Sequence, residues 1–317
     1  TFRREAERSK LAWLLFLVID PILGMTFFLS FGRSFKMSLR SRKRDLKPAG
    51  EYQDLDSTRS IPLDDPFYKY ARILDTASKQ NKLPLSVGSS QTRLIQNGES
   101  FFPALIQSIK DAKHHILIEA YILRYDTRGQ EIIELLIEKA QAGLKVVLII
   151  DGLGSASFAR FKKHIFKGTH VEFYVFDPFT FPLFNTRITY RNHRKLFIID
   201  DVAYLGGMNI GDEYDNSVPY YTFFKDTMLK VEGEAVESVL AIFKKDYYYV
   251  TGNPLELTFK HKSVKHDGFV QLVESGPDSL STDIHDLYLG LIMRAEKSVQ
   301  IMTPYLALDD ELLAAFK

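Results

Sequence analysis

The sequence predicts an α/β protein in which helices sandwich a mixed β-sheet, preceded by a transmembrane helix. A long apolar run lies near the start, and short apolar strands alternate with amphipathic helices from about residue 92. One helix–strand pattern also recurs further along the chain. Strand–helix alternation is typical of a sheet covered by helices. The recurrence predicts that a first repeat is complete and that a second repeat has only begun.

The apolar run covers residues 11–31, 21 residues in which Asp20 is the only charge. At about 1.5 Å of rise per residue, roughly 20 helical residues cross the hydrocarbon core of a bilayer. The run therefore predicts a transmembrane helix. Because a carboxylate is costly inside a membrane and Pro21 follows it, two alternatives stay open at Asp20: a kink, or a pair of half-helices that dip into one leaflet.

Basic residues flank the apolar run on both sides. Seven Lys and Arg residues lie between positions 33 and 47, and four lie between positions 3 and 10. The excess after the run predicts that its C-terminal side faces the cytoplasm. Cations beside a membrane also favour anionic lipids. We therefore expect residues 1–47 to form a membrane anchor with a basic flank.

The rest of the chain divides by composition. Residues 48–91 are polar and rich in proline, which predicts a linker, and residues 92–255 form the first repeat. Helices are expected at 100–112, 129–143 and about 234–247, and strands at 115–123, 145–151, 171–176, 195–200 and 202–207. Glu119 and Asp151 lie at strand ends, where capping or turn formation explains them at least as well as contact with a ligand.

An internal repeat relates residues 94–123 to residues 272–306. Ala112 matches Ala295 at an offset of 183 residues, and Tyr121 matches Tyr305 at 184. Shared apolar patterning alone can produce such a match, but the matching turn and tyrosine favour a duplication. Residues 256–317 are then a linker and the start of a second repeat that stops within its first helices. The chain begins at Thr1 and not at a methionine, and its second repeat is interrupted. We therefore expect it to lack residues at both ends.

Composition excludes several classes of function. The net charge is only +1, which gives no support for a nucleic-acid partner. The chain has no cysteine, so disulfides, thiolate metal sites and cysteine nucleophiles are ruled out. The histidines lack the spacing to carboxylates that a metal site requires. We expect no metal and no cofactor.

The residues that carry chemistry lie between positions 192 and 214. His193 and Lys195 share one face of a strand because residues i and i+2 do so. A turn at Asp200 and Asp201 makes the two strands at 195–200 and 202–207 a hairpin, which returns the segment that follows to the His–Lys end. That segment contains the remaining candidates, Gly206, Gly207 and Asn209.

These side chains suit an anionic phosphoryl group. A neutral imidazole is nucleophilic near pH 7, and Lys195 and Asn209 stabilise charge that develops on phosphate oxygens. Gly206 and Gly207 allow the backbone to approach a substrate closely. On the pattern alone, a hairpin whose His and Lys are ordinary surface residues stays open.

The pattern H-x-K-x4-D followed by G-G-x-N resembles the HKD signature of the phospholipase D superfamily. The strings RNHRKLFIID, LGGMNIGDEY and KDTMLKVEGEAV are similar to those of bacterial cardiolipin synthases in particular. The resemblance implies two HKD half-sites that meet at a pseudo-two-fold axis. It implies that His193 is the nucleophile of a phosphohistidine intermediate, that Lys195 and Asn209 bind phosphate, and that Asp226 orients the imidazole. Asp200 of the motif is expected to be a structural brace.

The same resemblance implies a reaction and a location. The enzyme is expected to be a phosphatidyltransferase that makes cardiolipin from two phosphatidylglycerol molecules with release of glycerol, at a bacterial cell membrane and with its catalytic domain in the cytoplasm. The second half-site is expected further along the same polypeptide, or in a homodimer, and this chain alone is expected to be inactive. A phospholipase D-type hydrolase, a nuclease of the same superfamily, another phosphatidyltransferase and an inactive membrane protein stay open as alternatives. Lys225 and Met228 depart from the usual RDTH-like string.

Overall fold

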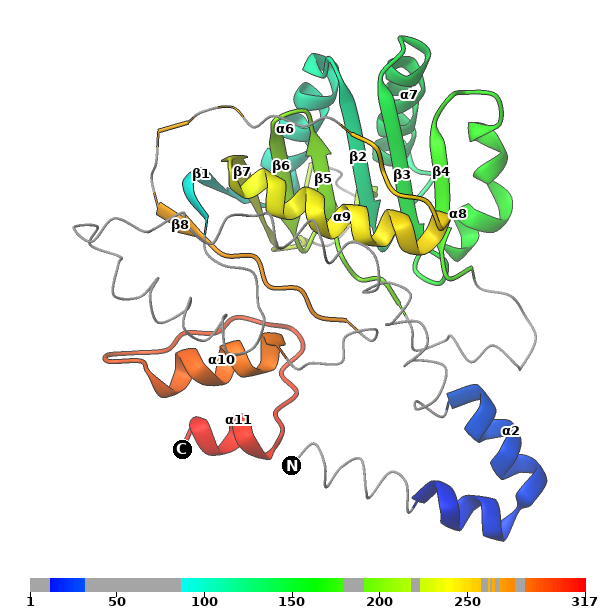
Figure 1. The fold of residues 1–317 in the computed structure, drawn as a ribbon, viewed down its shortest axis with the longest axis vertical. Helices are drawn as coiled ribbons and strands as arrows, with labels where there is room; N and C mark the ends of the chain where they lie inside the picture. Colours follow the sequence, from blue (N-terminus) through cyan, green and yellow to red (C-terminus); the bar gives the residue numbers. More distant parts are fainter. Residues whose placement is uncertain are drawn as a thin grey trace.

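The computed structural model describes residues 12–31, 87–178, 191–217, 223–257, 262, 264–265, 268–276 and 283–317. Its body is an eight-stranded mixed sheet with strand order β4-β3-β2-β5-β6-β7-β1-β8 (Figure 1). The strands are β1 Val87–Gln96, β2 His115–Ala120, β3 Lys145–Asp151, β4 Glu172–Phe176, β5 Leu196–Ile199, β6 Val202–Gly206, β7 Thr227–Gly233 and β8 Gly268–Val270. The predicted mixed sheet is therefore confirmed.

Parallel pairing is confined to one half of the sheet. β2 pairs with β3 and β3 with β4 in parallel, whereas the other neighbours are antiparallel. Every residue of β2 is buried, as expected for a strand covered on both faces. β5 and β6 form the predicted hairpin, and Asp200 stands in its turn with φ of 49°. Aspartate tolerates this left-handed conformation better than most residues.

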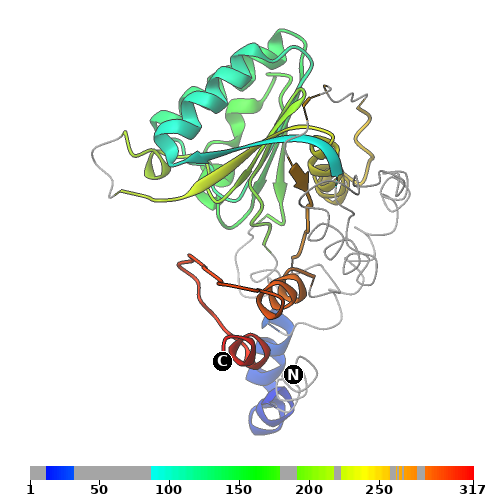
Figure 2. The same ribbon diagram turned by 90° about the vertical axis from the view of Figure 1, so that its left-hand side faces the viewer.

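Helices cover both faces of the sheet. α6 (Gly98–Asp111) and α7 (Thr127–Gln141) lie behind it in Figure 1, and α9 (Ala235–Thr251) crosses its front; Figure 2 shows the layers from the side. One core cluster contains Phe101 and Ile132 of the rear helices with Ile118 of β2. A second contains Phe243 of α9 with Leu117 of β2. Neighbouring β2 residues thus point into opposite cores, as the strand period requires.

Shorter elements connect the layers. They are α8 (Ala156–Phe161), η1 (Lys163–Phe166) and η2 (Asp212–Tyr214), and the C-terminal part of the chain adds α10 (Asp283–Met293) and α11 (Asp310–Ala315). In the second copy of the repeat, α10 takes the place of α6. Residues 298–304, which the repeat relates to β2, form no strand, so this part of the repeat is not matched by the structure.

Three strands were not foreseen from the sequence. β1, β7 and β8 lie together at one side of the sheet, and β1 begins at Val87, inside the segment expected to be a linker. Its sequence VGSSQTRLIQ has no apolar alternation. β1 instead gains its backbone hydrogen bonds from β7 and β8. The sheet thus extends beyond both expected limits of the first repeat, 92 and 255.

The apolar run near the start does not form one continuous helix. Residues 12–19 are helical, Asp20 interrupts the helix, and α2 covers Pro21–Phe31. Within the part of the chain that the structure describes, no helix combines the length and the apolar character needed to cross a membrane. The break at Asp20 agrees with the alternatives that the sequence left open.

Candidate active site

His193 and Lys195 come together in the extended segment that leads into β5. His193 is exposed and Lys195 is buried beneath it. Lys195 Nζ lies 3.1 Å from His193 Nδ1 and donates to the His193 carbonyl oxygen at 2.7 Å. The predicted pairing of the two side chains is therefore present. While Lys195 is charged it donates to Nδ1, and a neutral imidazole then carries its proton on Nε2.

Tyr121 forms one wall of this pair. It follows β2, and its ring centroid lies 4.6 Å from that of His193 at an interplanar angle of 53°. Lys195 Nζ lies 5.4 Å from the same tyrosine centroid, within the range of a cation–π contact. The tyrosine ring shields one side of each group from water. The charges of His193 and Lys195 therefore act on one another through a medium less polar than bulk water.

Burial lowers the pKa of both side chains, and the charge of Lys195 adds to the shift of His193. Burial lowers the pKa of His193, the charge of Lys195 lowers it further, and Asp151 opposes the shift. Burial also lowers the pKa of Lys195 to about 8, against the attraction of Asp226 and Asp151. Near pH 7 the imidazole is consequently neutral while most Lys195 side chains are charged. These are the protonation states that nucleophilic attack on a phosphate requires.

Asp151 ties the end of β3 to the segment that carries His193. Its Oδ1 accepts from the amides of Leu153 and Gly154 at 2.7 and 2.9 Å, which caps the turn after the strand. Its Oδ2 accepts from the Asn192 amide at 2.9 Å. Arg191 Nη1 lies 3.4 Å from Oδ1. Asp151 thus forms the turn that the sequence favoured and also holds the neighbour of His193, a second role that the sequence did not reveal.

Asn209 is buried and joins two loops at the same rim. Its Oδ1 accepts from the Ile122 amide at 2.9 Å, and its Nδ2 donates to the Tyr214 hydroxyl at 2.8 Å. One N–H of the amide is left for a phosphate oxygen. Asn209 therefore fixes the loop after β6 against the end of β2, in addition to any contact with substrate.

Asp226 lies beside Lys195, and Gly207 makes room for it. Asp226 Oδ1 accepts from the Thr227 amide at 2.7 Å. Its carboxylate raises the pKa of Lys195 against the effect of burial. Among the described residues no hydrogen bond joins Asp226 to His193, so the orienting contact implied by the family resemblance is not seen. A Cβ at Gly207 would lie 2.2 Å from Asp226 Oδ2, whereas Gly206 meets the Thr227 carbonyl and Met228.

Gly207→Ala is expected to push the Asp226 carboxylate away from Lys195. Because that carboxylate supports the charged form of Lys195, the pKa of Lys195 should fall below about 8. Reductive 13C-methylation followed by an NMR titration of the labelled amine measures the midpoint directly. Gly290→Ala is the control, since a Cβ there meets only the flexible end of the Arg294 side chain. An unchanged midpoint in Gly207→Ala would contradict the proposed contact.

Asp200 lies at the opposite end of β5 from His193. Its carboxylate accepts from three successive amides, those of Lys113, His114 and His115, at 2.7, 3.0 and 2.9 Å. These bonds lower its pKa against the effect of burial. They join the turn of the hairpin to the start of β2, which supports the structural role expected for Asp200 and leaves it away from the chemistry.

Asp200→Asn is expected to lower the free energy of unfolding by about 1–3 kcal/mol at pH 7, because an amide NH2 faces backbone donors. Because folding lowers this pKa, the Asp200 carboxylate stabilises the fold above its ordinary pKa, and this contribution is lost as the pH falls through the folded value. Urea unfolding should therefore show the full difference at pH 7 and a smaller one as the pH falls through the folded pKa of Asp200. Asp201→Asn is the matched control, and an equal loss in that variant would contradict the assignment.

A buried layer of charged groups lies directly behind the His193 segment. The side chains of Asn192 and Arg194 lie on either side of His193 in the chain, and Asn192 Nδ2 donates to Glu119 Oε1. Arg194 contacts Asp246 Oδ2 at 3.2 Å and Glu274 Oε2 at 3.3 Å. Burial, and then the charge of Asp246, raises the pKa of Glu119 well above its usual range. For Glu119 the sequence left capping, turn formation and contact with a ligand open, and it gave no indication of the carboxyl pair.

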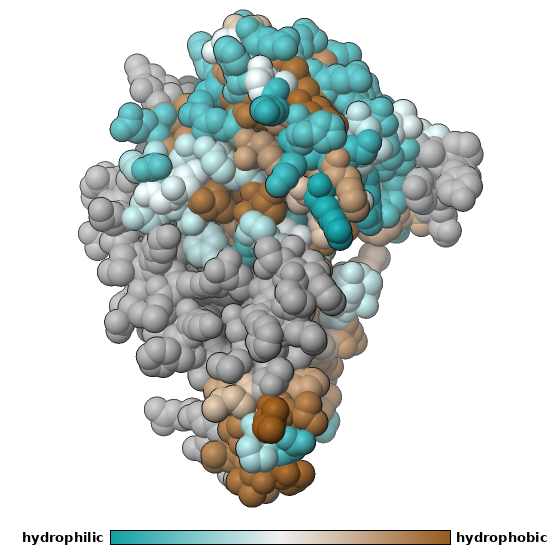
Figure 3. Space-filling model, turned by 90° about the vertical axis from the view of Figure 1, so that its right-hand side faces the viewer, coloured by the Kyte–Doolittle hydropathy of each residue, from teal (hydrophilic) through white to brown (hydrophobic). Residues whose placement is uncertain are grey.

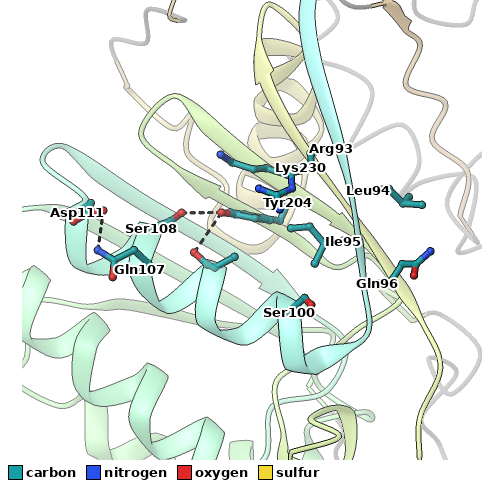
Figure 4. Close-up of a pocket in the computed structure, with 11 residues that line it drawn as sticks. Arg93, Leu94, Ile95, Gln96, Ser100, Gln107, Ser108, Asp111, Tyr204 and Lys230 are labelled. Carbon is teal, nitrogen blue, oxygen red and sulfur yellow. Dashed lines mark hydrogen bonds between the residues drawn. The ribbon is translucent and has the colours of Figure 1, made fainter.

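A metal-binding cluster and a surface groove are the remaining candidate sites. In the described part of the chain, no group of three or more His, Cys, Asp or Glu side chains is placed to hold a metal ion. A groove of about 520 Å³ lies between α6 and strands β1, β6 and β7 (Figure 4). Its wall contains Arg93, Lys230 and Tyr204, whose hydroxyl lies 2.8 Å from Ser108 Oγ. None of the predicted site residues lines this groove.

The fold and the site together define a phospholipase D-like α/β domain. Residues 105–244 match the family described as "Cardiolipin synthase, PLD-like domain". The chain is 35% identical to the cardiolipin synthase of Alkalihalophilus pseudofirmus over 100% of its own length and 64% of the relative's. It is 37% identical to cardiolipin synthase 2 of Bacillus anthracis, over 97% of its own length and 61% of the relative's. The chain is thus similar to cardiolipin synthases over nearly all of its length, and residues 105–244 match their phospholipase D-like domain.

A solved structure supports the fold. The phosphatidylserine synthase of Haemophilus influenzae superposes with a TM-score of 0.51 at 16% identity, over 76% of this chain and 62% of that one. Identity this low bears on the fold alone. The chain spans about three-fifths of the length of the curated relatives that it matches, 64% and 61% for the two described above.

Proposed function

We propose that this chain supplies one catalytic half-site of a phosphatidyltransferase that makes cardiolipin from two phosphatidylglycerol molecules and releases glycerol. The observation that carries the proposal is the exposed His193 imidazole with Lys195 Nζ buried 3.1 Å from its Nδ1. The names of the relatives support the substrate class. The donor and acceptor are lipids of an anionic membrane, and neither a metal nor a cofactor takes part.

The reaction is a double displacement. A lone pair of the His193 imidazole attacks the phosphorus of one phosphatidylglycerol, the phosphorus–oxygen bond to the terminal glycerol breaks, and a phosphatidyl-histidine forms. The departing alkoxide takes a proton from an acid of the second half-site. That group, now a base, removes the proton from a headgroup hydroxyl of the second phosphatidylglycerol. The new alkoxide attacks phosphorus and frees His193.

Lys195 has two effects in this scheme. Its ammonium group stabilises the charge on the non-bridging phosphate oxygens in the transition state. A phosphate that attracts the ammonium group also draws it away from Nδ1, which releases a lone pair of the imidazole. The second N–H of Asn209 and the bare backbone at Gly206 and Gly207 supply further contacts for the phosphate.

The second half-site is proposed to come from a second repeat of the same polypeptide, with a homodimer as the alternative. Asp126 and Asp309, which the repeat offset of 183 residues relates, both cap helices. Asp126 accepts from the Gly129 amide at 3.0 Å, and Asp309 from the equivalent Leu312 amide at 2.9 Å.

Rapid denaturation during turnover tests the mechanism. Membranes carrying the protein and 32P-phosphatidylglycerol should yield acid-labile phosphate on His193, and His193→Asn should yield none. Cardiolipin as the product supports transfer, whereas phosphatidic acid alone would support the hydrolase alternative. Full activity without labelled His193 would overturn the proposed intermediate.

We place the reaction at the cytoplasmic face of a bacterial membrane, with residues 1–47 as the anchor.

A further inference from the structure

The break in the apolar run at residue 20 is a built helix boundary. Asp20 Oδ1 accepts from the amides of Ile22 and Leu23 at 3.1 and 2.9 Å, and Pro21 is the first residue of α2. Aspartate as the N-cap with proline directly after it is a favourable start for a helix, because the carboxylate satisfies amides that have no partner in the first turn. The charge at position 20 is thus hydrogen-bonded within the chain.

The two helical segments fold back against one another. A Cβ at Gly24 would lie 2.8 Å from Leu17 Cα, so the arms approach as closely as a glycine permits. The rings of Trp13 and Phe28 have centroids 5.5 Å apart. In a continuous helix these two residues would be separated by roughly 22 Å of rise. Residues 12–31 are therefore a helical hairpin, with its apex at Asp20 and Pro21.

The outside of this hairpin is apolar, and most strongly so near the apex. Val18, Ile19 and Ile22 are 79%, 79% and 81% exposed, and Leu14 and Leu15 are more than half exposed. Figure 3 shows the hydrophobic surface at the lower end of the molecule, away from the mostly hydrophilic catalytic domain. Such a contiguous apolar patch marks a surface that is covered by another apolar phase.

The dimensions and charges of the hairpin fit one leaflet. The 11 residues of α2 rise about 16 Å, close to half of the roughly 30 Å hydrocarbon core of a bilayer. Both flanks are basic, with four cations before the run and seven after it. A spanning helix places its flanks on opposite faces, whereas a hairpin places both against the same anionic surface.

We propose that residues 12–31 enter one leaflet of the membrane apex first and leave it on the side from which they entered. The partner is the anionic leaflet at the cytoplasmic face. The apolar side chains at the apex reach the middle of the bilayer, and the basic flanks contact lipid headgroups. This inference rests on the proposed membrane location of the protein, and it does not depend on the reaction.

Cysteine labelling tests the topology, because the chain contains no cysteine of its own. Single variants Ser9→Cys and Ser34→Cys report the two flanks, and Ile19→Cys reports the apex. A membrane-impermeant maleimide is applied to intact spheroplasts and to inside-out vesicles. We expect both flanks to react in inside-out vesicles only, and the apex to react in neither until detergent is added. Flanks that react from opposite faces, or an apex that reacts as fast as the flanks, would overturn the proposal.

A second pair of variants tests the cause of the turn. Asp20→Leu combined with Pro21→Leu removes the cap and restores a continuous apolar helix of spanning length, so Ser9→Cys should move to the outer face. The matched control, Leu14→Ala with Leu15→Ala, keeps the break and should leave both flanks inside. If the double leucine variant keeps both flanks inside, Asp20 and Pro21 do not set the topology and the proposal fails. Carbonate extraction reports whether each variant is still attached to the membrane, and a cardiolipin assay reports whether it is still active. Together they distinguish a failure of the anchor from a failure of the proposed reaction.

Discussion

Lys195→Met is expected to lower kcat/KM for cardiolipin formation by about 10²–10³-fold, because it removes a preorganised positive charge from the position where phosphate charge develops. Two pH limbs should change with it. The pKa of Lys195 is about 8, so kcat/KM of the wild type should fall as the pH rises through that value. The pKa of His193 is lowered by burial and by Lys195, so the acid limb of the wild type lies below the ordinary histidine value.

The signs of these shifts separate Lys195 from other basic groups. Removing the positive charge at position 195 removes one of the causes that lower the pKa of His193, so the acid limb of Lys195→Met should move upward. Lys195→Arg keeps the charge and does not titrate near pH 8, so its alkaline limb should move upward by more than one unit. Rates of the polypeptide that carries both half-sites, measured on phosphatidylglycerol vesicles from pH 5 to 10, give both limbs. An alkaline limb that stays in place in Lys195→Arg would assign it to another group.

The sequence predicted those parts of the fold whose pattern is local. β2 and β3 are continuous apolar segments, and the His193–Lys195 pair follows from the spacing of two residues on one extended segment. The strand β1 could not be predicted in this way. Its polar sequence is set in the sheet by the backbones of β7 and β8, and such pairing leaves no periodic signal within the strand itself.

The candidate site shows the same division. Neighbours within a few residues of His193 were identified, whereas the groups that tune it come from distant parts of the chain. Tyr121 follows β2 and Asp151 is the last residue of β3, and only the parallel pairing of these strands brings their ends beside His193. The side chain of Asp226 was expected to contact the imidazole and instead acts on Lys195. The direction of the Asp226 side chain depends on Gly207, because a Cβ at residue 207 would occupy the space of the Asp226 carboxylate.

Arg194→Met is expected to lower the free energy of unfolding by about 3–5 kcal/mol, since it leaves the buried Asp246 carboxylate with one cation fewer. Asp246 is 0% exposed, and Arg194 Nη1 lies 3.2 Å from it. The same change removes the contacts of residue 194 with Asp246 and Glu274. Because residue 194 is next to His193 in the chain, activity should fall together with stability. Urea unfolding of the folded chain measures the first effect. Lys230→Met is the matched control, because Lys230 pairs with Glu232 at a partly exposed position.

Glu119→Gln should behave in the opposite way, and the pH dependence of its stability identifies the protonation state of Glu119 that the fold favours. Burial and Asp246 raise the pKa of Glu119, so the protonated acid is the form that the fold favours. A carboxyl group raised in this way contributes its full stability below its ordinary pKa and loses it as the pH rises through the folded value. Gln mimics the protonated acid and does not titrate. The variant should therefore match the wild type in stability below about pH 4 and exceed it at pH 9. Equal losses at both pH values would show instead that Glu119 is held as a carboxylate by Arg194 and Asn192, and the acid–carboxylate pair behind His193 would then be wrong.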